Sequence, residues 1–248
     1  MLLLLIIGMV FIPSNVYAWG TLTHIYLANE IFYLAPLLPA GIYSIVKRYK
    51  KDFLYGNIMA DTIFAKGLLP LDKNPHNWDV AFDMLEKANN ASQRAFVYGY
   101  LCHLAADTVA HGDLVRSGNL NHTIMELKVD RLINSRYWFQ AVMIDREIQV
   151  RNDIFLKGSL ESAIFSFKTN KRLFKGFVFL SILNKTLLPM HYIRKGQRFR
   201  NKMHALSGNI KWPSEIKRLR EISLERMVDV LYNGKDSRVT KRSPFLEI

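Results

Sequence analysis

Apolar residues recur at helical spacing along most of the chain, and no segment keeps the two-residue alternation that is typical of a half-buried strand. Asn90, with Gln93 three residues later, resembles a capping box and predicts a helix that runs to Ala110. Segment 174–188 is apolar but carries Lys185, which favours a buried helix over a membrane span. The other segments with helical spacing are 23–34, 42–50, 81–87, 120–134, 137–155, 160–169 and 215–231.

These segments predict one all-α domain, a single helical bundle over residues 19–232. The tripeptide Trp-Pro-Ser at 212–214 predicts a turn just before the last helix. The longest irregular stretch is the loop 65–75. We expect residues 233–248 to form a frayed, basic C-terminal tail.

The chain opens with an apolar run that is too short to cross a bilayer. Residues 2–12 form about 16 Å of helix, whereas the hydrocarbon core of a membrane is about 30 Å thick. Pro13 ends the run, and a short polar stretch leads to the small residue Ala18. This pattern predicts a signal peptide over residues 1–18, cleavage before Trp19, and a secreted, periplasmic or envelope-associated protein. No Lys or Arg precedes the apolar run, so an uncleaved membrane anchor is the alternative.

The chain is strongly basic, and the excess lies mostly in its second half. It has 34 Lys and Arg against 21 Asp and Glu, a formal charge of +13. Such a surface attracts phospholipid headgroups, lipopolysaccharide or nucleic-acid phosphates, although it also fits a merely solvated basic surface. We expect four aromatic residues near the basic segments to be exposed: Phe174, Phe177, Phe199 and Trp212.

Cys102 is the only cysteine, which excludes an intrachain disulfide. Stability must then come from core packing or from bound metal. We expect Cys102 itself to be a small buried residue.

Five of the seven histidines fall between residues 24 and 122, close in sequence to several carboxylates. His103 and Asp107 lie four residues apart on one expected helix, so they share a face. The residues between them are apolar, which turns that face inward, and a buried Asp needs a counter-charge or a metal. His and carboxylate ligands suit zinc. The segment 98–113 is therefore the most informative part of the chain for a metal site.

Further candidate metal ligands lie on both sides of this segment, although each one alone is weak evidence for a metal site. His122 and Glu126 form a second pair with helical spacing, Asp61 follows an apolar turn, and His76 lies in a loop. Taken singly, such a pair is more often a surface hydrogen bond, and a single histidine is more often a turn residue. His24 is equally open to an incidental role at a helix start. The ordered set is what indicates a metal centre.

This ordered set resembles the zinc-dependent phospholipase C family, whose superfamily also includes single-strand-specific nucleases and the catalytic domain of GPI-specific phospholipase D. The matching features span residues 19–126. They are Trp19-Gly20, His24, Asp61, His76, His103 with Asp107, and His122 with Glu126. The resemblance implies a helical bundle with three zinc ions in a cleft.

The resemblance also implies the ligands of each ion. Asp61, His76, His103 and Asp107 would hold the first. The α-amino nitrogen and carbonyl oxygen of Trp19 would join His24 and Asp107 on the second, so Asp107 would bridge the two. His122, Glu126 and a histidine shortly after Asp107 would hold the third.

The third site departs from the family pattern. In the family that histidine follows the bridging aspartate by six positions, where this chain has Asp113, whereas His111 follows at four. Either His111 takes the place or the third site is altered or empty, and we expect His111. His191 and His204 lie outside the pattern.

Two zinc ions sharing one carboxylate imply hydrolysis of a phosphodiester by an activated water, with Asp61 as a candidate general base. Phospholipid at a membrane surface is the substrate class we expect, because the chain is basic and carries an export signal. A single-strand nuclease with the same metals is one alternative. A non-catalytic envelope protein, stabilised by zinc and binding anionic surfaces, is the other.

Overall fold

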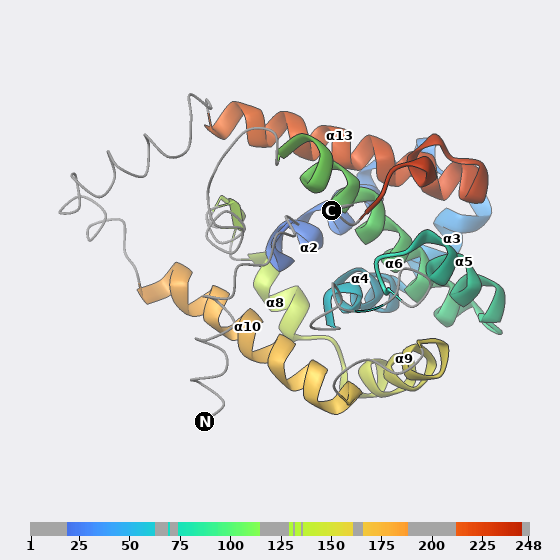
Figure 1. Ribbon diagram of the computed structural model, residues 1–248, viewed down its shortest axis with the longest axis horizontal. Coiled ribbons are helices and arrows are strands. Elements are labelled where there is room, and N and C mark those ends of the chain that lie inside the picture. The colour runs from blue at the N-terminus through green and yellow to red at the C-terminus, as the bar shows by residue number, and fades with distance from the viewer. Residues whose placement is uncertain are drawn as a thin grey trace.

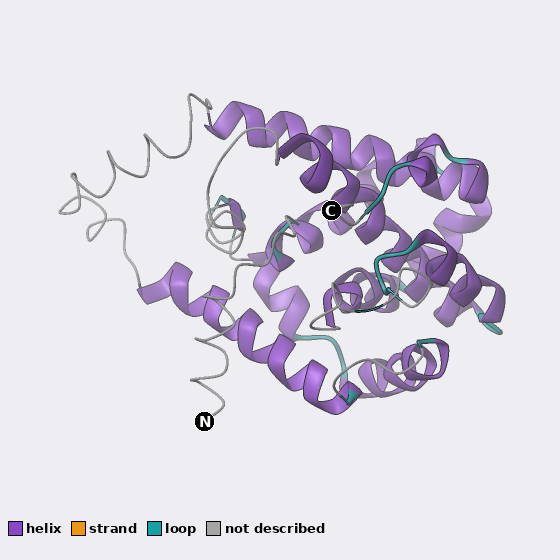
Figure 2. Ribbon diagram, viewed as in Figure 1, coloured by secondary structure: helices purple, strands orange, loops and turns teal. Residues whose placement is uncertain are grey.

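The computed structural model describes residues 19–62, 69, 74–114, 129–130, 132–134, 136–160, 166–187 and 212–244. Over these ranges every regular element is a helix, and none is a strand (Figure 2). The expectation of an all-α fold is confirmed. No helix in the described part of the chain is long and apolar enough to span a membrane. The leader 1–18 lies outside the described residues.

The helices follow one another in the order shown in Figure 1. The N-terminal half contains α2 (Thr21–Glu30), η1 (Ile31–Leu37), α3 (Ala40–Arg48), α4 (Lys50–Met59), η2 (Ala60–Thr62), α5 (Trp78–Lys87), α6 (Ala91–Val109) and η5 (Ala110–Leu114). The C-terminal half contains α8 (Arg136–Val142), α9 (Arg146–Ser159), α10 (Phe167–Leu187), α13 (Trp212–Asn233), η7 (Gly234–Asp236) and η8 (Arg238–Lys241).

Helix α6 forms the centre of the bundle, between α4 on one side and α13 on the other (Figure 1). Two glycines let α4 and α6 approach closely. A Cβ at Gly56 would lie 1.8 Å from the carbonyl oxygen of Phe96, and one at Gly99 would lie 1.9 Å from that of Phe53. Every residue of α6 from Gly99 to Val109 is buried, and Cys102 is fully buried as expected. The donors on α6 therefore face the protein interior.

Asparagine side chains cap the N-termini of α5 and α6. Asn90 Oδ1 accepts a hydrogen bond from the Gln93 N–H at 2.9 Å, as the capping pattern predicts. The Gln93 side chain reaches back to the N–H of Asn89 at 2.8 Å, one residue before the cap. Asn77 caps α5 by accepting from the Asp79 N–H at 2.8 Å, so this helix begins before the predicted residue 81.

Helix α4 is the element that the apolar pattern misses. The helix predicted over 42–50 is α3, which begins two residues earlier and ends at Arg48, because the chain breaks at Tyr49 before α4. In α4 every residue from Asp52 to Met59 is buried, so no polar face marks its helical period. At the N-terminus, the helix predicted over 23–34 begins earlier and passes into the 3₁₀ helix η1.

Three other predicted boundaries are wrong. The helix expected over 137–155 is two helices, α8 and α9, because the chain turns at Met143 and buries Ile144 between them. Leu160, the expected start of another helix, is the C-cap of α9. The next helix is the single α10, which joins the second part of 160–169 to 174–188. Phe174, expected to be exposed, is buried in it.

The C-terminal part is folded rather than frayed. Residues 212–214 lie in the first turn of α13, where a proline is tolerated because its missing N–H has no helical partner. After α13, Val239 is buried, and the Trp78 indole donates to the carbonyl oxygen of Arg242 at 2.8 Å. The prediction of a frayed tail is therefore wrong for residues 233–244.

Candidate metal centre

Four side chains from three separate parts of the chain meet beside α6. Asp61 comes from η2, His76 from the turn before α5, and His103 and Asp107 from α6. One ligand atom from each lies within 4.8 Å of every other. The structure thus brings together the four residues that the sequence assigns to a first metal ion.

Five of the six separations between these atoms are close to those of a tetrahedral metal site. The His76 Nε2 atom lies 3.1 Å from the His103 Nε2, 3.1 Å from the Asp107 Oδ2 and 3.3 Å from the Asp61 Oδ1. The His103 Nε2 lies 3.1 Å from the same Asp107 oxygen and 3.6 Å from the same Asp61 oxygen. Four ligands at about 2.0–2.1 Å from a zinc ion stand about 3.3–3.4 Å apart. Both the donor set and its spacing fit zinc.

The other oxygen of Asp107 faces a second group of donors. Its Oδ1 lies 3.1 Å from the His24 Nε2 and 3.4 Å from the main-chain nitrogen of Trp19. Over the described residues neither ring nitrogen of His24 makes a hydrogen bond, so its contact with Asp107 is close but not aligned. The His24 Nε2 and the Asp107 Oδ1 are therefore arranged so that both can bind one metal ion between them. Each Asp107 oxygen therefore serves one side of the centre.

Hydrogen bonds to the backbone fix the orientation of His103. Its Nδ1–H donates to the carbonyl oxygen of Asn57 at 2.9 Å, which leaves Nε2 free to face the other donors. The Asn57 side chain in turn donates to the Gly99 carbonyl at 3.1 Å, so it ties α4 to α6. The His24 ring stacks on His103 with centroids 3.8 Å apart.

The loop that carries His76 is held by two further polar contacts. The His76 N–H donates to Asn74 Oδ1 at 2.9 Å, and the buried Tyr100 hydroxyl donates to the Pro75 carbonyl at 2.6 Å. Both Trp78 and Tyr100 are buried, so they pack in the core. The sequence analysis does not identify Asn57, because its contacts cross from α4 to α6. Asn74 acts locally, and an Asn two residues before a candidate ligand is a signal that could have found it.

Trp19 is fixed between α6 and α13. Its indole Nε1–H donates to the carbonyl oxygen of Ala106 at 3.1 Å and to Ser223 Oγ at 3.0 Å. The Trp19 side chain is almost fully buried. These contacts hold the main-chain nitrogen of Trp19 next to Asp107.

The centre is electrostatically matched to cations. Burial alone would raise the pKa of Asp107, but His103 and His24 hold that pKa well below its ordinary value. Burial alone would lower the pKa of His103, but the Asp107 and Asp61 carboxylates raise it to about 9. Burial and the neighbouring His103 lower the pKa of His24, so His24 is neutral near pH 7. Without metal, Asp107 is therefore ionised beside a protonated His103.

Of the ligands predicted for a third ion, the structure describes only His111. His111 is buried in the π-helical turn η5 that follows α6. The side chain of Asp113 and all of His122 and Glu126 lie outside the described residues, as do His191 and His204. The ligands of a third ion therefore stay a prediction.

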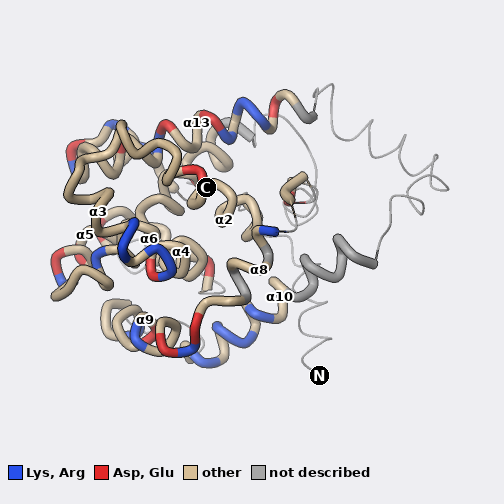
Figure 3. Tube along the Cα trace, turned by 180° about the vertical axis from the view of Figure 1, so that it is seen from behind, with Lys and Arg blue, Asp and Glu red and all other residues tan. Residues whose placement is uncertain are grey.

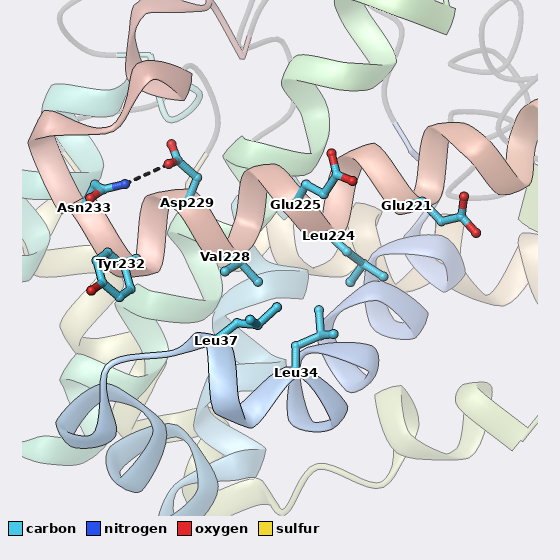
Figure 4. Close-up of a pocket in the computed structure, with 9 residues that line it drawn as sticks. All are labelled: Leu34, Leu37, Glu221, Leu224, Glu225, Val228, Asp229, Tyr232 and Asn233. Atoms are coloured by element: carbon cyan, nitrogen blue, oxygen red, sulfur yellow. Dashed lines mark hydrogen bonds between the residues drawn. The ribbon is translucent and has the colours of Figure 1, made fainter.

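A groove elsewhere on the surface contains none of these donors. It runs between η1 and α13 (Figure 4), with apolar side chains such as Leu34 and Val228 on its floor and Glu221 and Glu225 beside it. No histidine lines it. Among the described residues, the His, Cys, Asp and Glu side chains that lie close enough together to hold a metal ion are Asp61, His76, His103 and Asp107.

Comparison with known protein families agrees with this geometry. A family model described as zinc dependent phospholipase C matches residues 23–172, more than half of the chain. The match includes all four residues that meet beside α6. No curated protein and no solved structure matches the chain significantly. The chain belongs to the zinc-dependent phospholipase C family.

Proposed function

We propose that this protein is a zinc-dependent phosphodiesterase of the cell envelope or the secreted fraction that hydrolyses phospholipids. The observation that carries the proposal is the carboxylate of Asp107, whose two oxygens face two different donor groups. His76 and His103 lie on one side, and His24 with the Trp19 nitrogen lies on the other. A bridging carboxylate between two ions is the arrangement that phosphoryl chemistry uses.

The residues of the chain would hold the ions and handle the proton. When bound, such a zinc pair lowers the pKa of a water molecule and neutralises charge on the phosphate oxygens. The Asp61 side chain is 22% exposed, whereas those of His103 and Asp107 are almost fully buried. Asp61 is thus the most accessible of these three side chains, and a carboxylate that solvent can reach can accept the proton of the attacking water.

We further propose that export completes the metal centre. Removal of residues 1–18 would turn the main-chain nitrogen of Trp19 from an amide into an amine. A free α-amino group has a pKa of about 7.7–8.0, so it can lose its proton and bind a metal. Its nitrogen already lies 3.4 Å from Asp107 Oδ1. Processing would therefore supply a ligand that the precursor lacks.

Apolar side chains on the C-terminal helices support a lipid substrate. Phe139 and Met143 are exposed four residues apart at the end of α8, and Val150 and Ile154 are exposed four apart on α9. Lys and Arg lie along the first part of α10 (Figure 3), and Lys175 of this helix contacts Gln149 of α9. Exposed apolar groups beside positive charge are typical of proteins that bind anionic membrane surfaces.

Hydrolysis assays on processed protein beginning at Trp19 test the proposal. We expect zinc-loaded protein to release headgroup or phosphate products from phospholipid vesicles, and Asp107→Asn to abolish this. Asp52→Asn is the matched control, because Asp52 is a buried carboxylate that pairs with Arg151 rather than with the metal donors. Turnover of single-stranded DNA instead of lipid would make the protein a nuclease. Bound zinc with neither activity would make the metal structural.

A further inference from the structure

A buried carboxylate from a distant part of the chain contacts the first turn of α2. Asp130 Oδ2 accepts from the Leu22 N–H at 3.1 Å. Its Oδ1 accepts from the Thr23 N–H at 3.0 Å and from the Thr23 hydroxyl at 2.7 Å. The N-cap residue, Gly20, has no side chain to cap this helix, so Asp130 takes that role from outside. The negative charge also suits the positive end of the helix dipole.

The lack of a side chain at Gly20 leaves room for the Asp130 carboxylate. A Cβ at residue 20 would lie 2.4 Å from Asp130 Cγ and 2.6 Å from its Oδ1, well inside van der Waals contact. Any side chain at this position would push Asp130 away from the helix. The glycine next to Trp19 and the carboxylate of Asp130 therefore define one contact.

The contact between Gly20 and Asp130 lies next to Trp19 and His24, the two residues that face Oδ1 of Asp107. Trp19 precedes Gly20 directly, and the His24 N–H donates to the Gly20 carbonyl at 3.1 Å in the first turn of α2. A rotation of this turn would move the Trp19 nitrogen and the His24 ring together. Asp130 restrains the turn on which both donors depend.

Asp130 is held in place by its own surroundings. The carbonyl oxygen of the preceding Val129 accepts a hydrogen bond from the Arg220 guanidinium at 3.2 Å. Arg220 also stacks over the Tyr26 ring, 5.5 Å from its centroid. Val129 and Asp130 are both buried. The carboxylate is thus anchored to α13 and to α2, so it can restrain the turn it contacts.

We propose that Asp130 is the positioning residue of the N-terminal half of the metal centre. It contacts neither the ion nor substrate, but it sets where the Trp19 nitrogen and His24 face Asp107. The inference rests on the proposed function, in which these donors hold the second zinc ion. Residues that orient metal ligands in this way typically change metal affinity by about 10- to 100-fold when they are replaced.

Zinc binding to Asp130→Asn tests the proposal. Asn keeps the size of the side chain but places an N–H₂ group against one of the N–H donors of α2. We expect chelator competition to show one ion bound as in the wild type and the second bound about 10- to 100-fold more weakly. Asp52→Asn is the control, because Asp52 is equally buried but bonds to Arg151 and Asn152. Asp52→Asn should lower the melting temperature without lowering the affinity for either zinc ion.

The outcomes separate this inference from the proposed function. If the wild type holds no second ion, the proposed function fails, and the role of Asp130 fails with it. If the wild type holds two ions and Asp130→Asn binds both as tightly, only the role of Asp130 is refuted. If Asp130→Asn weakens the binding of both ions equally, or if Asp52→Asn weakens the second ion as much, Asp130 contributes only to general stability.

Two variants at the partners of Asp130 keep the test valid if Asp130→Asn folds poorly. Thr23→Val removes only the hydroxyl bond to Asp130 and should weaken the second ion alone, by a smaller factor. Gly20→Ala should lower the melting temperature of metal-free protein strongly in the wild type but little when combined with Asp130→Gly. Additive effects of the two changes would show that Gly20 and Asp130 do not form one contact.

Discussion

Replacing Asp107 by Asn in metal-free protein probes the charge balance of the centre. Asn keeps the shape of the side chain but removes the negative charge next to His103, whose pKa is about 9 in the folded chain. A histidine in the unfolded chain has a pKa of about 6.5. The protonated His103 therefore stabilises the folded state as long as Asp107 is ionised.

The pKa difference fixes the size and the pH dependence of this effect. A folded pKa of about 9 against about 6.5 contributes about 2.5 kcal/mol to the free energy of unfolding at pH 7. The raised pKa makes this contribution complete below about pH 6.5 and removes it as the pH rises through about 9. Asp107 is the larger of the two carboxylate contributions, ahead of Asp61. We expect Asp107→Asn to cost about 2 kcal/mol at pH 7 and close to nothing from this source at pH 10.

Urea unfolding at both pH values, with chelator present and helicity followed by circular dichroism, measures this loss. Asp52→Asn is the matched control, since the Arg151 partner of Asp52 stays charged at both pH values and its cost should not change. An Asp107→Asn cost that is equal at pH 7 and pH 10 would refute a protonated His103 beside Asp107.

Three further predictions concern the supports of the centre. Tyr100→Phe leaves the Pro75 carbonyl unpaired, so the free energy of unfolding in urea titrations should fall by about 1–3 kcal/mol. Zinc affinity should fall about tenfold because the loop that carries His76 loosens. Unchanged zinc affinity would contradict a role of Tyr100 in holding this loop. Gly56→Ala places a Cβ 1.8 Å from the Phe96 carbonyl oxygen, so we expect a loss of about 3 kcal/mol or more in the same titration, and an intact stability would show that the two helices can separate freely. Chelation should lower the melting temperature in calorimetry, and free zinc at about 100 times its Kd should restore about 2.7 kcal/mol, whereas zinc without effect would exclude a folded-state site.

The helical class of the fold and the pairing of His103 with Asp107 are accessible from sequence because both depend on local spacing, whereas Asp61 and His76 join them only through the family resemblance. His103 and Asp107 share a face at four residues apart, and the apolar residues between them turn that face inward. Asn90 begins α6 through a cap that only its neighbours supply. Such features need no knowledge of the remaining chain.

The residues that position the donors depend on contacts that sequence spacing does not encode. Asp130 lies more than 100 residues from the helix it caps, and its spacing to Thr23 carries no periodic signal. Asn57 orients His103 from α4, a helix that is buried on all sides and so lacks an amphipathic pattern. Gly20 is the one local hint, because a glycine beside a candidate ligand indicates a close approach.

Anomalous scattering at the zinc edge, from crystals of processed, zinc-loaded protein, decides whether Asp107 bridges two zinc ions. We expect two peaks, each about 2.0–2.2 Å from a different oxygen of Asp107. One should also contact His76 and His103, and the other should contact His24 and the nitrogen of Trp19. A single peak, or zinc bound away from Asp107, would contradict this bridge.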